Sequence, residues 1–154
     1  MTAILLSVRP RFAHAILDGT KSAEVRRRFP SQPDRATVFL YSSTPERAVL
    51  GTVHLDAIDR PQADDVWNLY HDRIEIEEAS LNDYLEDVDA AAILRISAPH
   101  RWDTPVPLSD LRRIIGVEPP QSFRYLDDDQ SHRLTRLGSA TDTQAAASML
   151  VAVS

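Results

Sequence analysis

The stretch Ile4-Leu5-Leu6-Ser7-Val8-Arg9-Pro10 decides how the rest of this chain folds. Its apolar residues predict a strand over residues 3–8. Pro10 suits the first turn of a helix, because that position needs no backbone N–H. Apolar residues then recur at helical spacing from Ala13 to Leu17, and Gly19 supplies the left-handed residue with which many helices end. The chain therefore begins with a strand and a short helix.

The next stretch, Lys21-Ser22-Ala23-Glu24-Val25-Arg26-Arg27-Arg28, concentrates charged side chains. Residues 22–28 have the alternation of a strand, so every second side chain lies on one face. One face carries Ser22, Glu24, Arg26 and Arg28. Because this face is polar, we expect it to lie outside the core.

Two more strands are predicted over residues 37–41 and 48–58. Gly51 marks a β-bulge or a close backbone approach in the second of them. An acidic insertion follows, with one helix that begins at Pro61 and another over residues 76–85.

The last part of the pattern contains a strand over residues 90–97 and a short helix over residues 108–114. We expect Pro105 and Pro107 to separate these two elements. The chain after Gly138 is small and polar, and we expect it to be loosely held.

The length of 154 residues, with 43% hydrophobic and 26% charged residues, is typical of one globular domain. The absence of cysteine excludes disulfides, Cys-ligated zinc and thiol catalysis. The five histidines form no metal-binding pair, and the four glycines form no phosphate-binding loop, so we expect no metal and no cofactor. The apolar runs are too short for a signal peptide or a membrane span, so we expect a cytoplasmic protein with no membrane contact.

The net charge of −6 is unevenly distributed. Residues 1–35 hold seven basic and three acidic side chains, a net charge of +4, whereas residues 46–90 hold three basic and thirteen acidic ones, a net charge of −10. Such an asymmetry indicates one face for a polyanion, and the alternative is a solvated acidic helix pair with a few surface arginines.

Several motifs, taken in order, resemble one protein family. The pattern Gly19-x-Lys21-x-x-Glu24-x-Arg26, preceded by Ser7-x-x-Pro10, is similar to the core signature of the ASCH domain, a PUA-like family associated with RNA binding. Three later segments resemble a bacterial ASCH subgroup: Tyr41-Ser42-Ser43-Thr44-Pro45, Val49-Leu50-Gly51-Thr52-Val53 and Pro119-Pro120-Gln121-Ser122-Phe123-Arg124-Tyr125-Leu126.

This resemblance implies an α+β fold, a small PUA-like mixed β-barrel with flanking helices. It assigns residues 3–126 to the ASCH domain. Residues 127–154 remain as a C-terminal extension, which we expect to be partly flexible.

The resemblance also implies that the protein binds RNA or a nucleotide-like ligand and regulates transcription or translation. The residue types that contact phosphates, base edges and base faces are arginine, lysine, polar amides and aromatics. The ligand-binding candidates are Lys21, Glu24, Arg26, Arg27, Arg28, Ser42, Gln121, Arg124 and Tyr125. Structural alternatives remain open: Lys21 and Glu24 as a plain ion pair, Arg26 as its internal partner, Ser43 as a turn residue and Phe123 in the core.

Two other classes of function are considered. The first is a hydrolase, acting on RNA as a ribonuclease or on a modified nucleoside such as N4-acetylcytidine, with Lys21 and Glu24 as catalytic residues. Family members of the second kind carry a threonine nucleophile where this chain has Glu24, and a carboxylate replaces that hydroxyl poorly. The other class is a protein-interaction module whose contact surface is the acidic helices of residues 64–89.

Overall fold

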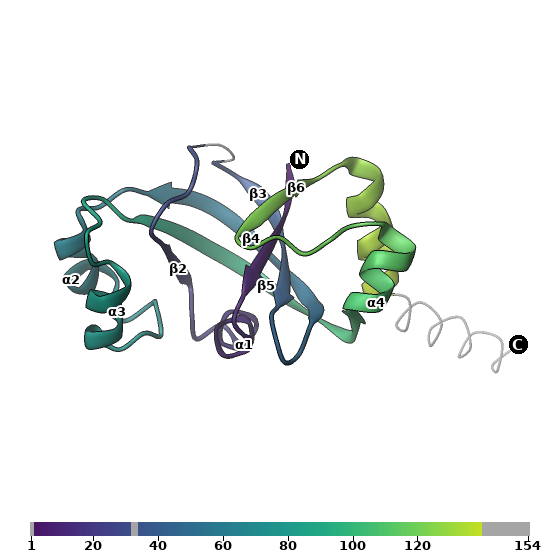
Figure 1. Ribbon diagram of the computed structural model, residues 1–154, viewed down its shortest axis with the longest axis horizontal. Helices are drawn as coiled ribbons and strands as arrows, with labels where there is room; N and C mark the ends of the chain where they lie inside the picture. The colour runs from purple at the N-terminus through teal and green to yellow at the C-terminus, as the bar shows by residue number, and fades with distance from the viewer. Residues whose placement is uncertain (1, 32–33, 140–154) are drawn as a thin grey trace, which may run out of the picture.

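The computed structural model describes residues 2–31 and 34–139 and is built on one curled six-stranded sheet (Figure 1). The strands lie in the order β2-β5-β4-β3-β1-β6, which makes β2 and β6 the two edges. Only β1 and β3 are parallel. The strands are β1 (Ala3–Val8), β2 (Ala23–Arg26), β3 (Ala36–Ser42), β4 (Ala48–Asp59), β5 (Ala92–Pro107) and β6 (Phe123–Leu126). The predicted α+β class, with a barrel-like mixed sheet and flanking helices, is confirmed.

The strand and helix predicted at the N-terminus are both present. Helix α1 (Pro10–Asp18) begins at the proline and ends at Gly19, whose φ is 85°. Strand β1 is buried on both faces, which explains its continuous apolar run. Ile4 and Leu6 pack on the same side as α1, whereas Leu5 packs on the opposite side.

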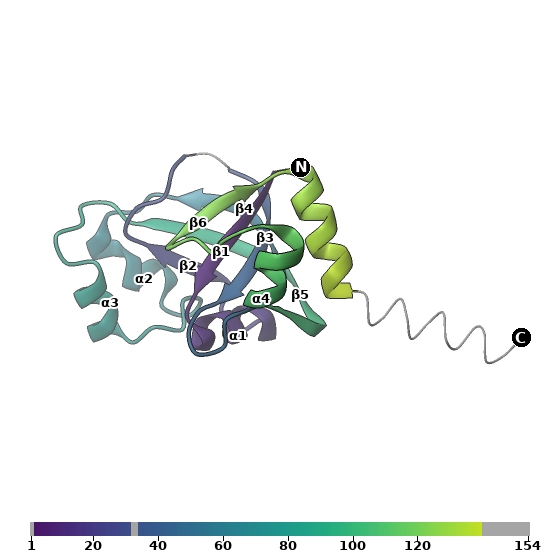
Figure 2. The same ribbon diagram turned by 45° about the vertical axis from the view of Figure 1, so that its right-hand side comes forward.

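The acidic insertion lies at one end of the sheet (Figures 1 and 2). It contains the 3-10 helix η1 (Ala63–Asp65), helix α2 (Val66–Tyr70) and helix α3 (Glu78–Tyr84). Its apolar side chains pack against Ala23 and Val25 of β2. The insertion is therefore fixed to the strand that carries the charged motif.

Strand β5 is much longer than the predicted strand over residues 90–97: it continues through Pro105 and ends at Pro107, directly before the predicted short helix. The pairing of β5 with β4 shifts register between Arg101 and Val106, and Pro105 lies within that irregular stretch. A proline there removes no regular ladder hydrogen bond. Gly51 lies at the same shift, and a Cβ on it would lie 2.2 Å from the carbonyl oxygen of His100, so the predicted close approach is confirmed.

The chain after β5 forms α4 (Leu108–Asp110) and the π-helix η2 (Leu111–Ile115), and a further helix covers residues 128–139 (Figure 2). Leu134 on this last helix is fully buried, and Gly138 lies against the ring of Trp102. This helix was not predicted from the sequence, and it lies within the extension over residues 127–154 that was expected to be partly flexible. Of the chain after Gly138, which was expected to be loosely held, residues 140–154 lie outside the described residues, and the domain boundary after residue 126 stays a prediction.

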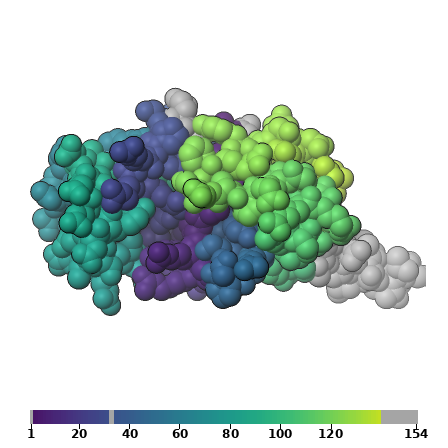
Figure 3. Space-filling model, in the orientation of Figure 1, coloured from purple at the N-terminus to yellow at the C-terminus, as the bar shows by residue number. Residues whose placement is uncertain are grey.

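In the space-filling view, the purple N-terminal segment is visible between the teal insertion and the green C-terminal part (Figure 3). The described part of the chain contains no helix with the length and apolar character needed to cross a membrane.

The contact between Gly138 and Trp102 predicts that a Gly→Ala substitution in this helix destabilises the protein instead of stabilising it. Gly→Ala inside a helix ordinarily stabilises by up to about 1 kcal/mol. Here the new Cβ would lie 2.2 Å from the Trp102 ring, which is itself buried. We expect Gly138→Ala to lower the free energy of unfolding by about 1–3 kcal/mol in urea denaturation. Arg136→Ala, on the same helix but exposed, should change it by less than about 0.5 kcal/mol; stabilisation by Gly138→Ala would contradict the packing.

Candidate ligand-binding site

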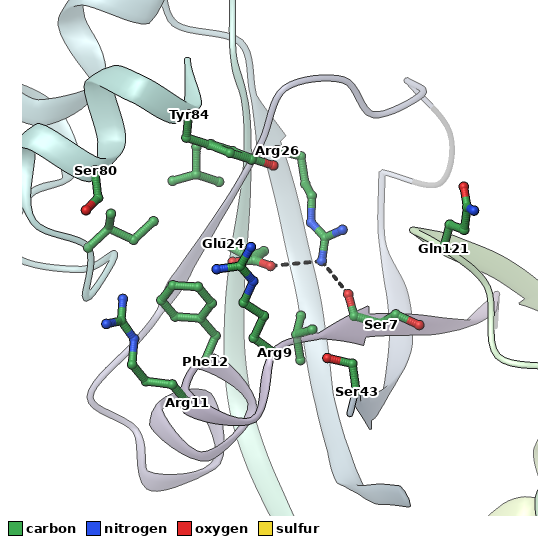
Figure 4. Close-up of a pocket in the computed structure, with 13 residues that line it drawn as sticks. Ser7, Arg9, Arg11, Phe12, Glu24, Arg26, Ser43, Ser80, Tyr84 and Gln121 are labelled. Carbon is green, nitrogen blue, oxygen red and sulfur yellow. Dashed lines mark hydrogen bonds and ion pairs between the residues drawn. The ribbon is translucent and has the colours of Figure 1, made fainter. Parts of the chain in front are cut away.

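A cavity of about 600 Å³ opens between α1, α3 and the edge strand β2 (Figure 4). One half, toward α1 and the insertion, is mainly apolar and holds Phe12, Val25, Ile76 and Tyr84, together with Arg11 and Ser80. The other half is polar and holds Ser7, Arg9, Arg26, Ser43 and Gln121. Glu24 lies between Phe12 and Arg26. The cavity thus joins an apolar surface to a basic one, with a single carboxylate at its wall.

Glu24 holds two cations, although only 5% of the residue is exposed. Its Oε1 lies 3.3 Å from the Lys21 Nζ, and its Oε2 accepts a hydrogen bond of 2.9 Å from the Arg26 Nη2. The polar face of β2 was expected outside the core, and it does border the cavity while Ala23 and Val25 on the opposite face join a hydrophobic cluster, but Glu24 itself is buried. A buried carboxylate is tolerated here because two opposite charges compensate it.

Lys21 lies beneath the cavity and does not line it. Its side chain is fully buried, its Nζ donates to the carbonyl of Ile74, and the same atom lies 4.8 Å from the centre of the Phe12 ring. Burial lowers the pKa of Lys21 below its usual value of 10.5, although the negative charge of Glu24 opposes that shift. Lys21 therefore stabilises the Glu24 carboxylate from the side away from the cavity.

Arg26 connects the two edges of the sheet. Its Nη2 donates to the carbonyl of Ser7 on β1 at 2.8 Å, and its Nη1 donates to the Ser122 Oγ, just before β6, at 3.4 Å. Its Nε is buried and has no hydrogen-bond partner among the described residues. A buried donor without a partner costs free energy, so this Nε adds to the cost of holding the guanidinium between the strands.

The two arginines after Arg26 differ from each other. The Arg27 Nη1 donates to the carbonyls of Tyr84 and Glu86, at 2.9 Å and 3.2 Å, and so contacts the insertion. Arg28 is exposed, and no ion pair or hydrogen bond of its side chain is present in the described part of the chain.

The remaining candidates are divided between the cavity and its surroundings. Gln121 lines the cavity. Ser42 is buried and donates to Glu46 at 2.7 Å, so its neighbour Ser43 lines the cavity in its place. Arg124 and Tyr125 lie on β6, outside the residues that line the cavity.

Phe123 matches the core alternative. It packs against the hydrophobic cluster that contains Ile4 and Leu6, and its ring centre lies 4.6 Å from that of Phe29. Tyr125 is 49% exposed, and its ring lies edge-on to Phe123 at 5.7 Å.

Several residues that line the cavity were not among the candidates predicted from the sequence. Three of them, Arg9, Arg11 and Phe12, lie where the predicted strand meets the predicted helix. Their closeness to the charged motif in the sequence could have indicated them. Tyr84 had no such indication, because its approach to the cavity depends on how the insertion folds back on β2.

A second polar network fixes α1 to the turn after β3. The Glu46 Oε1 accepts from the Ser42 Oγ and lies 2.9 Å from the His14 Nε2, and Arg101 lies on the other side of the imidazole, 3.0 Å from its Nδ1. Burial raises the pKa of Glu46, but the hydrogen bonds from Ser42 and His14 outweigh burial, so the pKa falls below its usual value of 4.5. The network holds the turn that carries Ser43 at the cavity.

Among the described residues, no group of three or more His, Asp or Glu side chains is placed to hold a metal ion. The arrangement can therefore offer a ligand cationic donors, one carboxylate and two aromatic rings.

A curled mixed sheet with a Lys–Glu–Arg network beside its first helix defines a class of protein that comparisons identify. An ASCH domain-containing ribonuclease of Zymomonas mobilis is 31% identical over 141 residues, which cover 90% of this chain and 93% of the relative. The chain therefore belongs to the ASCH domain family. No family model matches it. The finer subgroup inferred from residues 119–126 stays a prediction.

Solved structures agree with this assignment. The crystal structure of ASCH from Zymomonas mobilis superposes with a TM-score of 0.82 at 28% identity and covers 88% of this chain and 94% of that one. A crystal structure from Pseudomonas putida has a TM-score of 0.54 at 13% identity, with 88% and 99% covered, and so shares the fold alone.

The first prediction for the site concerns the charge on Glu24. Glu24→Gln leaves Lys21 and Arg26 buried without their shared anion, and removal of one partner from a buried ion pair costs about 3–5 kcal/mol. We expect the free energy of unfolding to fall by that amount in urea denaturation. Glu118→Gln is the matched control, because Glu118 pairs with Arg112 at the surface and such pairs contribute about 1 kcal/mol or less. Equal losses in the two variants would contradict a supporting role for Glu24.

A second prediction concerns pH. Because the folded state lowers the pKa of Glu46, the unfolded chain binds that proton more tightly. The stabilisation is fully present above pH 4.5 and is lost as the pH falls through the lowered pKa. We expect the difference in unfolding free energy between the wild type and Glu46→Gln to shrink below pH 4.5. A difference that stays constant through that range would show that Glu46 is not stabilised as an anion.

Proposed function

We propose that this protein binds RNA by enclosing one nucleotide unit in the cavity beside Glu24 and Arg26. The observation that carries the proposal is the lining of the cavity, which brings Arg9, Arg11 and Arg26 together with a single carboxylate, that of Glu24. Arginine side chains can hold a phosphate, and charge-assisted hydrogen bonds from arginine to phosphate are strong.

The charges around the cavity support a polyanionic ligand. Within residues 2–31 and 34–139, the side chains of Arg9, at the cavity, and of Arg28, just after β2, make no ion pair or hydrogen bond. Arginines that are not neutralised internally are available to phosphates. The similarity to a protein named as a ribonuclease points to the same class of ligand.

We place this binding in the cytoplasm and in the regulation of transcription or translation, as the family's association with RNA suggests. Binding alone requires no reacting group in the cavity. A structural role for Lys21 agrees with this, because its Nζ is held by the Ile74 carbonyl and by Glu24.

Ribonuclease activity is the second candidate function, because the relative that shares 31% identity carries that name. In this alternative Lys21 and Glu24 would handle protons, and the lowered pKa of Lys21 would favour proton release. Deacetylation of N4-acetylcytidine is the less favoured hydrolase alternative, because Glu24 stands where a hydroxyl nucleophile is needed.

The binding proposal predicts a salt dependence. The double variant Arg9→Ala with Arg28→Ala should weaken binding of a single-stranded RNA and make the slope of log affinity against log salt shallower by about 0.7 for each lost phosphate contact. Fluorescence anisotropy with a labelled oligonucleotide measures this slope. Arg113→Ala with Arg136→Ala removes the same charge from exposed positions outside the cavity and should leave the slope unchanged. Equal effects of the two double variants would contradict the assignment of the binding face.

The same preparation separates binding from catalysis. Incubation of the wild type with RNA and with N4-acetylcytidine, followed by gel analysis and by acetate detection, should show neither cleavage nor deacetylation at an enzymatic rate. RNA cleavage that Glu24→Gln abolishes in a folded protein would establish the ribonuclease alternative in place of a simple binding protein.

A further inference from the structure

We propose that Tyr84, at the end of the acidic insertion, is the wall on which a planar heterocyclic base stacks, and that Arg27 holds this wall over the cavity. The inference rests on the proposed function and assigns the two halves of the cavity. The base lies toward the insertion, and the phosphate lies toward Arg26 and Ser7.

Tyr84 has the properties of a stacking surface. It lines the cavity and is 40% exposed, whereas Leu81 and Leu85 on the same segment are buried at 1% and 6%. In the described part of the chain its ring has no aromatic or cation partner. An exposed aromatic ring on a fixed helix end offers a π-face to any base.

Phe12, the other aromatic residue that lines the cavity, already has cationic partners over its ring. The Lys21 Nζ lies 4.8 Å from its centre and the Arg11 guanidinium carbon lies 4.7 Å from it. Figure 4 shows Phe12 and Tyr84 on opposite sides of Glu24. Phe12 therefore serves as the floor of the apolar half, and Tyr84 remains as the ring that is available to a ligand.

Arg27 provides the means of holding Tyr84. The last carbonyls of a helix have no partner within it, and arginine side chains can satisfy them. The Arg27 Nη1 donates to the carbonyl of Tyr84, the last residue of α3, and to that of Glu86. Arg26 contacts the sheet side of the cavity and Arg27 contacts the insertion side, so two successive residues position the two halves of the site.

The probes for the test are AMP, UMP and ribose 5-phosphate, titrated calorimetrically against the full chain. The wild type should bind both nucleotides. Tyr84→Ala should weaken both by about tenfold or more, the range for loss of one stacked base, whereas Tyr84→Phe should bind as the wild type does. Ribose 5-phosphate has no base, so its affinity should not depend on Tyr84. Thermal unfolding of each variant shows whether it is folded.

The role of Arg27 is tested by a double-mutant cycle. Arg27→Ala should weaken AMP and UMP but not ribose 5-phosphate, and it should have no further effect in a Tyr84→Ala background, because the two residues act through one wall. Arg28→Ala, the adjacent control, should weaken all three probes alike.

The outcomes separate this inference from the proposed function. If Tyr84→Ala leaves AMP binding unchanged while Arg9→Ala weakens it, the stacking wall is wrong and the binding proposal stands. If Arg27→Ala weakens ribose 5-phosphate as strongly as AMP, Arg27 is a phosphate contact and not a positioning residue. If the wild type binds none of the three probes, both proposals are contradicted.

Discussion

The rest of the structure depends on one carboxylate, that of Glu24, shared between Lys21 and Arg26. A buried ion is unfavourable unless opposite charges and hydrogen bonds compensate it, and here each cation has a further partner of its own. Lys21 reaches the insertion through the carbonyl of Ile74, and Arg26 reaches β1 through the carbonyl of Ser7. The single anion thus joins the first helix, the edge strand, the insertion and the centre of the sheet.

The sequence predicted the parts of the fold that depend on neighbouring residues. The apolar run of β1, the proline that starts α1 and the left-handed Gly19 are local features, and each was predictable from its own residue types. The burial of Glu24 on the polar face of β2 was not predicted, for the opposite reason. Whether Glu24 lies in solvent or in the interior depends on Ile74 and Ser7, which are distant in the chain, and no pattern within residues 21–28 contains that information.

The candidate site was predictable to the same extent. The charged motif indicated Glu24 and Arg26, because arginine and carboxylate at alternate positions of one strand must share a face. Tyr84 was inaccessible to this reasoning, since an aromatic residue at helical spacing is usually a packing residue. Only the fold of the insertion against β2 distinguishes it from Leu81, three residues earlier, which is fully enclosed. The helix of residues 128–139 was likewise missed, and it packs through Leu134 and through the contact of Gly138 with Trp102.

The position of Arg26 has a consequence for how this protein can change. The guanidinium joins the two edges of the sheet, β2 and the segment before β6, and the same group borders the cavity. An anion that accepts hydrogen bonds from the Arg26 Nη atoms competes with the Ser7 carbonyl and the Ser122 hydroxyl, which hold the edges together. The distance between the two edges of the sheet and the occupancy of the cavity therefore both depend on the Arg26 side chain. A ligand that binds well must also be compatible with the curvature of the sheet.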